Sequence, residues 1–539
     1  MNGRRRLLSR PAWLASFLAS LLLSVVAHAE TADVSIYDYL RAHVDPATGA
    51  LAADGTTLPD ESPARRFGRF RWVPGALEGL GTRHMQWDGS DKASRAVRLL
   101  EAIAGGDPTA EAVLYELLRT DDVVTFYSQT LDLASELIRN VEPELHGMAR
   151  RLATTAHDRG PVKFAIAMLG SIGDERDLSI VQTLALHDEF GLYAAEAIAE
   201  IAPDRQGALF DMARHLTGWG RIEAVARMVS TSDPTLRTWL LTEGFRNSVT
   251  PQYLAYQCVT IANLASALAA SPTAKRADIP LLVGAADLIQ ALITPGPGQG
   301  FDDYSDAQQT ATLFLQHIDR RRDSLSFFLA ATALKDYASG ATAWTPAQRG
   351  DVTALATRIA NDPVWRKDVV AAISDDRADL DQAELAARKL GIPTFQLHID
   401  RLAKNSSSPQ RWSHAFASAD AARVDRLIDI AERAFGTRLA EARTHRSTDP
   451  RDRSAGAALE AVLQGVAHYP GSGLALVEAS LADTSDSVRR AAVDTLVRWG
   501  DPYLRSESVR TALSDAARDE ADELLKARML ALLNASAIK

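Results

Sequence analysis

A short helical unit recurs along this chain, and it constrains the fold more than any other feature of the sequence. Each copy places apolar residues at helical spacing and ends at a Gly-Asp or Pro-Asp stop: AIAMLGSIGD at 165–174, AAEAIAEIAPD at 194–204 and AVDTLVRWGD at 492–501. The first two copies begin 29 residues apart, and such a period is typical of stacked helix pairs. The sequence therefore predicts an all-α fold, a right-handed superhelix (α-solenoid) of stacked antiparallel helix pairs with no substantial β-sheet.

Helix starts and apolar periodicity support the same fold. Six Asp-Pro dipeptides punctuate the chain, and we expect Asp to cap a helix while Pro occupies its first turn. No segment alternates as a strand would. Periodicity predicts helices at 36–43, 94–104, 110–119, 162–172, 222–229, 236–245, 254–270, 279–293, 307–318, 324–337, 352–360, 378–390, 419–435, 455–467, 474–482, 488–499 and 519–533.

Two segments interrupt the helical pattern. Residues 30–89 hold an early helix and a Gly/Pro/Arg-rich stretch, which we expect to form an N-terminal cap with an irregular Arg/aromatic loop, because the first unit of an array must cover an open apolar face. The string PGPGQG at 295–300 cannot continue a helix. The predicted organisation is therefore helical repeats at 90–294, a Gly/Pro linker at 295–304 and a second, degenerate set of repeats at 305–539.

The first 29 residues have the pattern of a cleaved signal peptide. Three arginines at 4–6 precede an apolar run at 14–26, and Ala27-His28-Ala29 offers a small-x-small cleavage site. We therefore expect a mature chain that begins near Glu30 and is periplasmic or secreted. No cysteine stands at the cleavage point and no later apolar run is long enough to span a bilayer, so no membrane anchor is expected.

Charge and cysteine content exclude several classes of function. Beyond residue 29 the chain has 55 basic and 69 acidic residues, a net charge of −14. Such a chain gains nothing from the counterion release that drives non-specific nucleic-acid binding, so no nucleic-acid partner is expected. Cys258 is the only cysteine, which excludes an intramolecular disulfide. We expect Cys258 to be buried as a small apolar residue; a catalytic thiol or an intermolecular disulfide are the alternatives.

Two segments resemble HEAT and HEAT-like (PBS-lyase-type) repeats. LGSIGDERDL at 169–178 resembles the linker after the second helix of such a repeat, and SVRRAAVDTL at 487–496 resembles that helix itself. The clear matches cover residues 160–215 and 472–500. The resemblance implies an α-solenoid used for protein binding, of an exported bacterial type, and it implies no catalytic residue.

A vaguer resemblance links residues 218–225 and 239–249 to bacterial repeat proteins, some of which carry a monoterpene-hydroxylase label. The chain has no thiolate haem motif, no Gly-rich flavin or nicotinamide loop and no paired metal-binding helices. Because nothing in the sequence could activate oxygen, we do not expect that activity.

The search for catalytic chemistry is negative. The twelve histidines are scattered, and no zinc, nucleophile-elbow or phosphate-loop motif is present. The sequence therefore predicts no catalytic residue, no metal and no cofactor. Two acidic groups could hold Ca²⁺ but lack the spacing of a known calcium loop, and we expect them to cap helices instead: Asp302, Asp303 and Asp306; and Asp375, Asp376, Asp379 and Asp381.

The strongest candidate binding feature is RRFGRFRWVP at 65–74, followed by RHMQWD at 83–88. It concentrates arginine and aromatic residues, types that are enriched at binding hot spots. The alternative is that these aromatics cover the open end of the first repeat while the arginines pair with nearby acids. The same two interpretations apply to Trp-Gly-Arg at 219–221. The candidate binding residues are Arg69, Trp72, His84, Trp87, Trp219 and Arg221.

These features favour an exported scaffold for protein–protein interaction without intrinsic catalysis, whose partner is another protein. A narrower form is a toxin-immunity type inhibitor. A helical-toroid enzyme, similar to a glycoside hydrolase or a lyase, is a different alternative, and it would need carboxylates or histidines that converge in a central pocket. A third alternative is a structural spacer in the cell envelope.

Overall fold

The computed structural model describes residues 34–61, 72–140, 142–270, 279–441 and 450–535. In these ranges the chain is all-α: it forms no strand, and its one β feature is an isolated antiparallel bridge between Val44 and Leu51. The all-α prediction is therefore confirmed, while the right-handed superhelix stays a prediction. The predicted signal peptide and the candidate residue Arg69 lie outside the described residues.

The chain divides into two compact units, residues 1–317 with 337–352 and residues 318–336 with 353–539. The Gly/Pro segment at 295–304 lies inside the first unit and contains a short 3₁₀ helix, Phe301–Asp303. The boundary between the compact units thus falls further along the chain than the linker that the sequence predicts.

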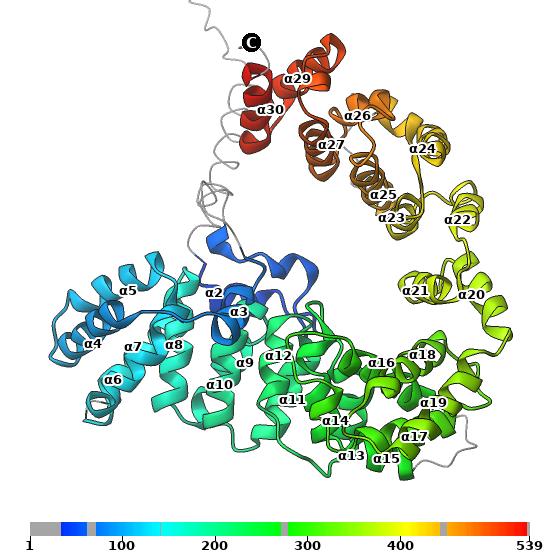
Figure 1. Ribbon diagram of the computed structural model, residues 1–539. Coiled ribbons are helices and arrows are strands. Elements are labelled where there is room, and N and C mark those ends of the chain that lie inside the picture. The colour runs from blue at the N-terminus through cyan, green and yellow to red at the C-terminus, as the bar shows by residue number, and fades with distance from the viewer. Residues whose placement is uncertain (1–33, 62–71, 141, 271–278, 442–449, 536–539) are drawn as a thin grey trace, which may run out of the picture. The chain divides into compact units, whose positions relative to one another are not determined.

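The first unit is built from short helices that follow one another closely (Figure 1). They are α2 Ile36–Ala42, α3 Ala76–His84, α4 Ser90–Ala104, α5 Ala110–Thr120, α6 Tyr127–Asn140, α7 Glu142–Thr155, α8 Arg159–Ile172, α9 Leu178–Leu184, α10 Gly191–Ile201, α11 Arg205–His215, α12 Trp219–Ala226, α13 Pro234–Trp239, α14 Ala255–Ile261, α15 Leu264–Ala270, α16 Ile279–Ile293 and α17 Ala307–Ile318. Helices α18 Leu325–Gly340 and α19 Pro346–Ala360 contribute residues to both units.

Helix α8 lies among other helices of the first unit. It contacts α5, α6, α7 and α10, and its residues from Gly160 to Leu169 are all buried. The predicted helix at 162–172 is apolar almost all round, and a helix of that kind must be covered on every side. The expectation that it lies between neighbouring layers is confirmed.

The N-terminal segment packs across several helices. Helix α2 contacts α7 and α9, and α3 contacts α12 and the 3₁₀ turn η5 Val123–Thr125. The approach of α3 is so close that a Cβ at Gly79 would lie 1.9 Å from the ring of Trp219. The segment therefore lies against helices from α7 to α12 and not only against the first pair, α4 and α5.

The Asp-Pro dipeptides cap helices less often than the sequence predicts. Asp233 is an N-cap as expected, since its carboxylate accepts hydrogen bonds from the N–H groups of Thr235 and Leu236. In three other cases the carboxylate accepts a hydrogen bond from the N–H two residues later, in a local turn, as Asp and Asn side chains often do. In a fourth case the aspartate is itself the first residue of the helix. These other described cases are Asp45, Asp107, Asp362 and Asp501.

Some predicted helices are wrong in detail. The single helix expected at 254–270 is two helices, α14 and α15, because Asn263 between them has φ +51°; asparagine tolerates this left-handed conformation better than most residues. The helix expected at 236–245 changes after α13 into a π-helical turn, η8 Leu240–Gly244. The structure also adds helices that the periodicity does not predict, among them α6 and α7.

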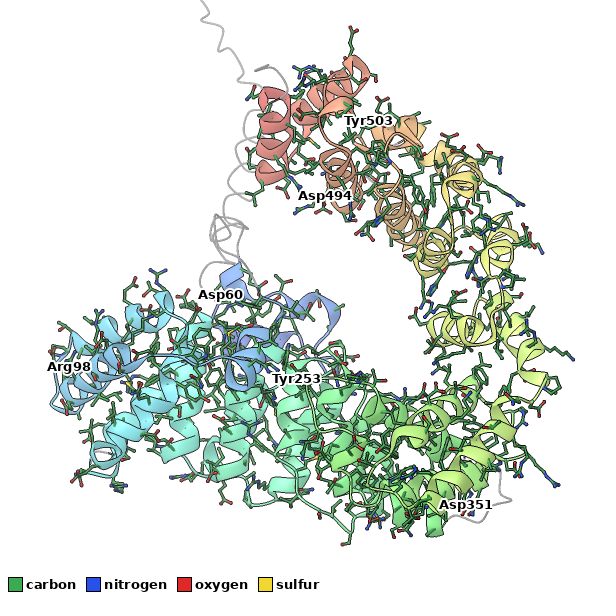
Figure 2. The ribbon with its side chains drawn as sticks, in the orientation of Figure 1. Asp60, Arg98, Tyr253, Asp351, Asp494 and Tyr503 are labelled. Carbon is green, nitrogen blue, oxygen red and sulfur yellow. The ribbon has the colours of Figure 1, made fainter. Side chains whose placement is uncertain are left out.

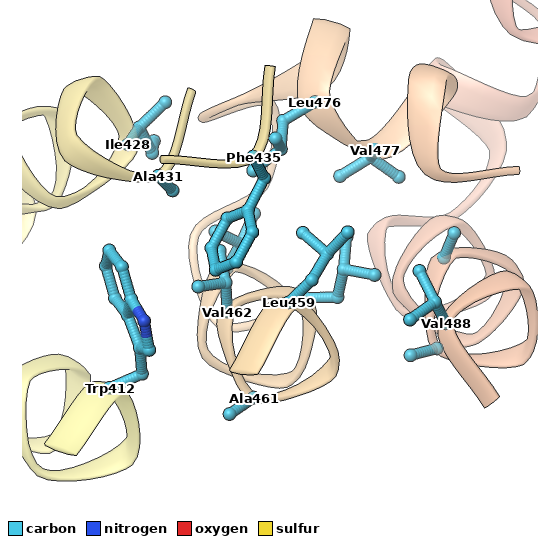
Figure 3. Packing of buried hydrophobic residues seen from close by; sticks show 14 of the residues in the cluster. Trp412, Ile428, Ala431, Phe435, Leu459, Ala461, Val462, Leu476, Val477 and Val488 are labelled. Atoms are coloured by element: carbon cyan, nitrogen blue, oxygen red, sulfur yellow. The ribbon is translucent and has the colours of Figure 1, made fainter. Parts of the chain in front are cut away.

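The second unit continues with helices of similar length. They are α20 Val364–Ser374, α21 Leu380–Leu390, α22 Phe395–Leu402, α23 Pro409–Ala417, α24 Ala421–Glu441, α25 Pro450–Val466, α26 Leu474–Ser480, α27 Asp486–Trp499, α28 Asp501–Leu504, α29 Glu507–Asp519 and α30 Glu523–Ala535. Figure 3 shows its core, where Phe435 of α24 points toward Val462 of α25 and Trp412 of α23 extends toward Ala431 of α24. The two aromatic ring centroids lie 6.1 Å apart, and the cluster extends to Val488 of α27.

The tightest backbone contact of α8 provides a test of this packing. A Cβ at Gly160 would lie 1.9 Å from the carbonyl oxygen of Leu118, at the end of α5. We expect Gly160→Ala to lower the free energy of unfolding by about 1–3 kcal/mol, because overfilled sites cost that much. Gly350→Ala is the control: it lies in α19, within the first unit, with no atom within 4 Å of the new Cβ, and we expect it to raise stability by up to about 1 kcal/mol. Urea titration of both variants measures the difference, and equal effects would contradict the close approach.

Candidate functional site

A cleft of about 650 Å³ opens in the first unit, between the N-terminal segment and the first turns of α8. One wall is formed by residues of the N-terminal segment, the second by the end of α5 and the turn after it at 118–123, and the floor by the start of α8 with Glu189. The wall and floor residues are Asp60, Glu61, Trp72, Leu77 and Glu78; and Asp158, Arg159, Gly160, Lys163 and Glu189. Figure 2 labels Asp60, one of the residues of the first wall. Four parts of the chain that are far apart in the sequence thus enclose one cavity.

Local structure explains why these segments meet. The close contact of Gly160 with Leu118 brings the start of α8 against the end of α5. The amino end of a helix attracts carboxylates, and the N–H of Arg159 donates to Asp60 Oδ2 at 3.1 Å. The Arg159 guanidinium then bonds both oxygens of Asp60, at 2.9 and 2.8 Å, and Glu61 Oε1 at 2.8 Å. This paired geometry is the strong form of an arginine–carboxylate contact, and it holds the N-terminal segment on α8.

Lys163 lies at the centre of the cleft floor. Its side chain is 8% exposed, and its Nζ lies 2.5 Å from Glu78 Oε1 and 2.6 Å from Glu189 Oε1. Burial alone lowers the pKa of a lysine, but the two carboxylates outweigh it and raise the pKa of Lys163 to about 12. Lys163 is therefore a permanent ammonium that joins α3, α8 and the 3₁₀ turn η7 Asp188–Phe190.

The two carboxylates on Lys163 differ in their surroundings. Burial raises the pKa of each, but Glu189 faces both Lys163 and Arg159, whose charges lower its pKa to about 2. Arg159 Nη1 lies 3.2 Å from Glu189 Oε1, and the N–H of Gly75 donates to Glu189 Oε2 at 3.3 Å. Glu78 shares only Lys163 and is repelled by Glu189, so burial leaves its pKa raised. The floor thus contains one firmly ionised carboxylate and one that takes up a proton more readily.

The described lining of the cleft is rich in charged side chains. Among these described residues, seven are acidic and three are basic. The acidic residues are Asp60, Glu61, Glu78, Asp121, Asp122, Asp158 and Glu189, and the basic residues are Arg119, Arg159 and Lys163.

Three of the candidate residues from the sequence surround α3. Trp72 precedes this helix, lines the cleft and is 36% exposed. Trp87 follows it and is 41% exposed, and its indole packs on the helix at Gly81. His84 Nε2 lies 2.9 Å from the hydroxyl of Tyr253. The structure therefore brings Trp72, His84 and Trp87 to one helix, which also supplies Glu78 to the cleft.

The other two described candidates pack inside the unit. Trp219 is 4% exposed, and its ring lies 5.0 Å from that of Tyr253. The Arg221 guanidinium donates to the carbonyl oxygens of Arg246, at 2.6 Å, and Ala213, at 3.0 Å. Both belong to the first turn of helix α12. These contacts fit the packing interpretation of 219–221, and neither residue lines the cleft.

Sequence reasoning missed the residues of the cleft floor. Lys163, Glu78 and Glu189 belong to no motif and lie far apart in the chain. One signal was present: Lys163 is the only charged residue between positions 160 and 172. A lysine inside an otherwise apolar run must find an acidic partner once its helix is buried.

The other residues that the sequence raises as possible reactive or metal-binding groups have structural roles where the structure describes them. Cys258 is fully buried, as predicted, and burial raises the pKa of its thiol, so the reactive thiolate is disfavoured. Asp379 caps α21 and Asp303 bonds the N–H of Gly300, while Asp376 pairs with Arg411. Within the described ranges no three His, Cys, Asp or Glu side chains are close enough to hold a metal ion. In the same ranges no helix has the length and apolarity needed to cross a bilayer.

No protein-family model, curated protein or solved structure matches this chain. A functional argument therefore has to start from the cleft and from α3.

The burial of Lys163 predicts that Lys163 contributes far more to the free energy of unfolding than the exposed Lys92 does. We expect Lys163→Met to lower the free energy of unfolding by about 3–5 kcal/mol, because it leaves buried carboxylates without their shared cation. Lys92→Met is the matched control: Lys92 pairs with Asp121 at 2.7 Å but is 44% exposed, and exposed pairs contribute about 1 kcal/mol or less. Chemical denaturation at neutral pH measures both, and a loss below about 1 kcal/mol at Lys163 would contradict the central role of this ion pair.

The opposite pKa shifts of Glu189 and Glu78 predict that their contributions to stability change in opposite directions with pH. Glu189 has a lowered pKa, so its stabilising contribution is present above the unfolded value of about 4.3 and is lost as the pH falls toward 2. The deficit of Glu189→Gln relative to the natural chain should therefore grow as the pH rises from 2 to 5. Glu78 has a raised pKa, so its contribution falls as the pH rises above about 4.3. Glu78→Gln should therefore gain stability relative to the natural chain between pH 4 and 7. Urea titrations across pH 2–7 measure both trends, and parallel trends would contradict the assignment.

Proposed function

We propose that this chain is an exported helical-repeat protein of the HEAT-like kind that binds another protein through the acidic cleft and the exposed residues around α3. The observation that carries the proposal is the combination of a cleft that contains buried ion pairs with the exposed tryptophans Trp72 and Trp87 on either side of helix α3, which borders that cleft. We assign it no catalytic residue, cofactor or nucleic-acid partner.

Exposed apolar side chains concentrate at this helix. Four residues between positions 72 and 87 are large, apolar and exposed: Trp72 at 36%, Val73 at 72%, Met85 at 40% and Trp87 at 41%. Exposed apolar groups close together and bordered by polar residues mark interaction sites, and tryptophan is enriched at binding hot spots. The two ends of α3 therefore supply the apolar part of the proposed binding surface.

The buried charge network supports binding by holding this surface in place. Lys163 and Arg159 attach α3 and residues 60–61 to α8 before any partner arrives. A surface that is already ordered loses less conformational entropy on association. A narrower form of the proposal is inhibition of a secreted toxin, but no described contact selects that kind of partner.

An enzymatic role is the alternative that the cleft itself raises. Glu78 and Glu189 have pKa values shifted in opposite directions, as in acid–base pairs. Glycoside hydrolysis, however, requires one carboxyl group to reach the leaving group and the other to reach the sugar or a water. Lys163 Nζ lies between the two carboxylates at 2.5 and 2.6 Å and binds an oxygen of each. We therefore propose binding in preference to hydrolysis.

Export provides the first test of this proposal. We expect the chain to be recovered outside the cytoplasm with Glu30 as its first residue, because Ala27-His28-Ala29 is the predicted cleavage site. Intact-mass measurement of the fractionated protein identifies the first residue. Ala29→Arg should block processing, while Ala32→Arg, beyond the site, should not. A full-length cytoplasmic chain would contradict export.

Partner binding at α3 provides the second test. A photo-reactive amino acid placed at Val73 should give one discrete cross-linked product in living cells, because Val73 lies beside Trp72 at the cleft. The same amino acid at Val229, which is 59% exposed in the same unit, is the control and should give none. Mass spectrometry of the product identifies the partner. No product at Val73, or equal products at both positions, would contradict the proposed surface.

A further inference from the structure

We propose that residues 73–87, with α3 at their centre, form a strap that opens as one unit while the helices beneath it stay folded, and that the partner is bound only while this strap is closed. The inference rests on the proposed function, because Val73, Met85 and Trp87, which are exposed residues of the proposed surface, belong to the strap. It adds regulation to that surface: a change that opens the strap releases the partner.

The strap has little tendency to form a helix by itself. Helix α3 has nine residues and contains two glycines, Gly79 and Gly81, and glycine is the least favourable helix residue after proline. Isolated helices of this length are unstable in water. Helix α3 therefore depends on its contacts with the rest of the first unit.

Apolar burial contributes little to those contacts. The two leucines of α3, at positions 77 and 80, are only partly buried. Four residues of this helix are buried, and only the first of them has an apolar side chain: Ala76, Glu78, Gly79 and Gly81. Hydrophobic stabilisation grows with the apolar area that is removed from water. Polar contacts therefore matter more for α3 than for a helix with a wide apolar face.

Near its amino end the strap is attached through Glu78. The carboxylate of Glu78 lies 2.5 Å from Lys163 Nζ, and the same ammonium lies 2.6 Å from the carboxylate of Glu189. The N–H of Gly75 also donates to Glu189, at 3.3 Å. Lys163 therefore keeps Glu189 as a counter-ion when Glu78 leaves with the strap.

Near its carboxyl end the strap is attached through Arg83. The guanidinium of Arg83 pairs with Glu223 and lies over the rings of Trp219 and Tyr253. Glu223 has a second cation, Arg227, at 2.6 Å and four residues later in the chain. Glu223 therefore also keeps a counter-ion when Arg83 leaves with the strap.

These second counter-ions make the strap separable from the helices beneath it. Breaking a buried ion pair is costly when it leaves one charge buried without a partner. Here Lys163 and Glu223 each keep a partner, while Glu78 and Arg83 enter water. Opening the strap therefore costs less than breaking two isolated buried pairs. Because opening also exposes little apolar area, we expect it to occur while α8 stays folded.

The contact beneath α3 is closely fitted, which provides a way to open the strap without changing a charge. A Cβ at Gly79 would lie 1.9 Å from the ring of Trp219, so alanine cannot occupy position 79 while the strap is closed. Alanine is otherwise the better helix former. A loss of order in Gly79→Ala thus comes from the lost contact with Trp219 and not from a weaker helix.

Native-state hydrogen exchange of the full mature chain, followed by mass spectrometry, tests whether the strap opens by itself. We expect the amides at 79–85 to exchange at least a hundredfold faster than those at 162–169 in the middle of α8. Their exchange should depend little on low concentrations of urea, because opening the strap exposes little surface. The amides of α8 should show the steep urea dependence of global unfolding.

Two variants open the strap in different ways, and each has a matched control. Gly79→Ala removes the fit to Trp219 and Arg83→Met removes one ion pair; each should accelerate exchange at 79–85 at least tenfold and change exchange at 162–169 less than twofold. Gly350→Ala, with no atom within 4 Å of the new Cβ in the same unit, and Arg98→Met, at an exposed position of α4 (Figure 2), should change exchange in both regions less than twofold.

Capture of the partner is the second readout. The photo-reactive amino acid at Val73 should give at least tenfold less cross-linked product when it is combined with Gly79→Ala, because the partner is bound only while the strap is closed. Combination with Gly350→Ala should leave the amount of product unchanged.

Three outcomes would overturn the inference and leave the proposed function standing. The first is exchange at 79–85 with the same rate and urea dependence as at 162–169, which would show that α3 opens only with global unfolding. The second is equal acceleration of both regions in Gly79→Ala and Arg83→Met. The third is undiminished capture at Val73 in Gly79→Ala although 79–85 exchange faster. Local opening of the strap without any capture at Val73 in the natural chain would instead contradict the proposed function and leave the strap itself standing.

Discussion

The buried ammonium of Lys163 is the interaction on which the first unit depends. Helix α8 is buried from Gly160 to Leu169, so Lys163, the one charged residue in that stretch, must be balanced inside the unit. Glu78 and Glu189 provide that balance at 2.5 and 2.6 Å. Since Glu78 belongs to α3, the need to pair Lys163 also places α3, and with it the exposed tryptophans. The electrostatic requirement of one side chain thus determines where the proposed binding surface lies.

This arrangement separates two uses of charge. Within the floor, Lys163 and Arg159 satisfy carboxylates and hold the N-terminal segment on α8. Asp122 is exposed and lines the same cleft as Trp72. The inner charges stabilise the cleft. A binding surface of the proposed kind would keep its shape without a partner, because the residues behind it are paired internally.

Arginine and aromatic residues near the N-terminus have two roles that their composition alone does not distinguish. Arg83 pairs with Glu223 and lies over the rings of Trp219 and Tyr253, so it serves packing. Trp72 and Trp87 stay exposed on either side of α3. The sequence left binding and packing open for this region, and within its described part the structure shows some of these residues packed and others exposed. The degree of burial determines whether a residue packs inside the unit or stays exposed, and it depends on the helices behind α3.

The sequence by itself determined the all-α class and many helices. Helices α16 and α17 have the predicted bounds, and α8 is buried as its apolar pattern requires. These features could be predicted because a helix depends on residues three and four positions apart, whose pattern is visible in a short stretch of sequence. The break at Asn263 and the π-helical turn at 240–244 were not predicted, since several backbone conformations fit the same apolar spacing there. The cleft was decided only by the tertiary structure. Glu78, Lys163 and Glu189 are 26 to 111 residues apart, and each is an ordinary charged residue in its own segment. They become a site because burial of α8 leaves Lys163 no other way to balance its charge.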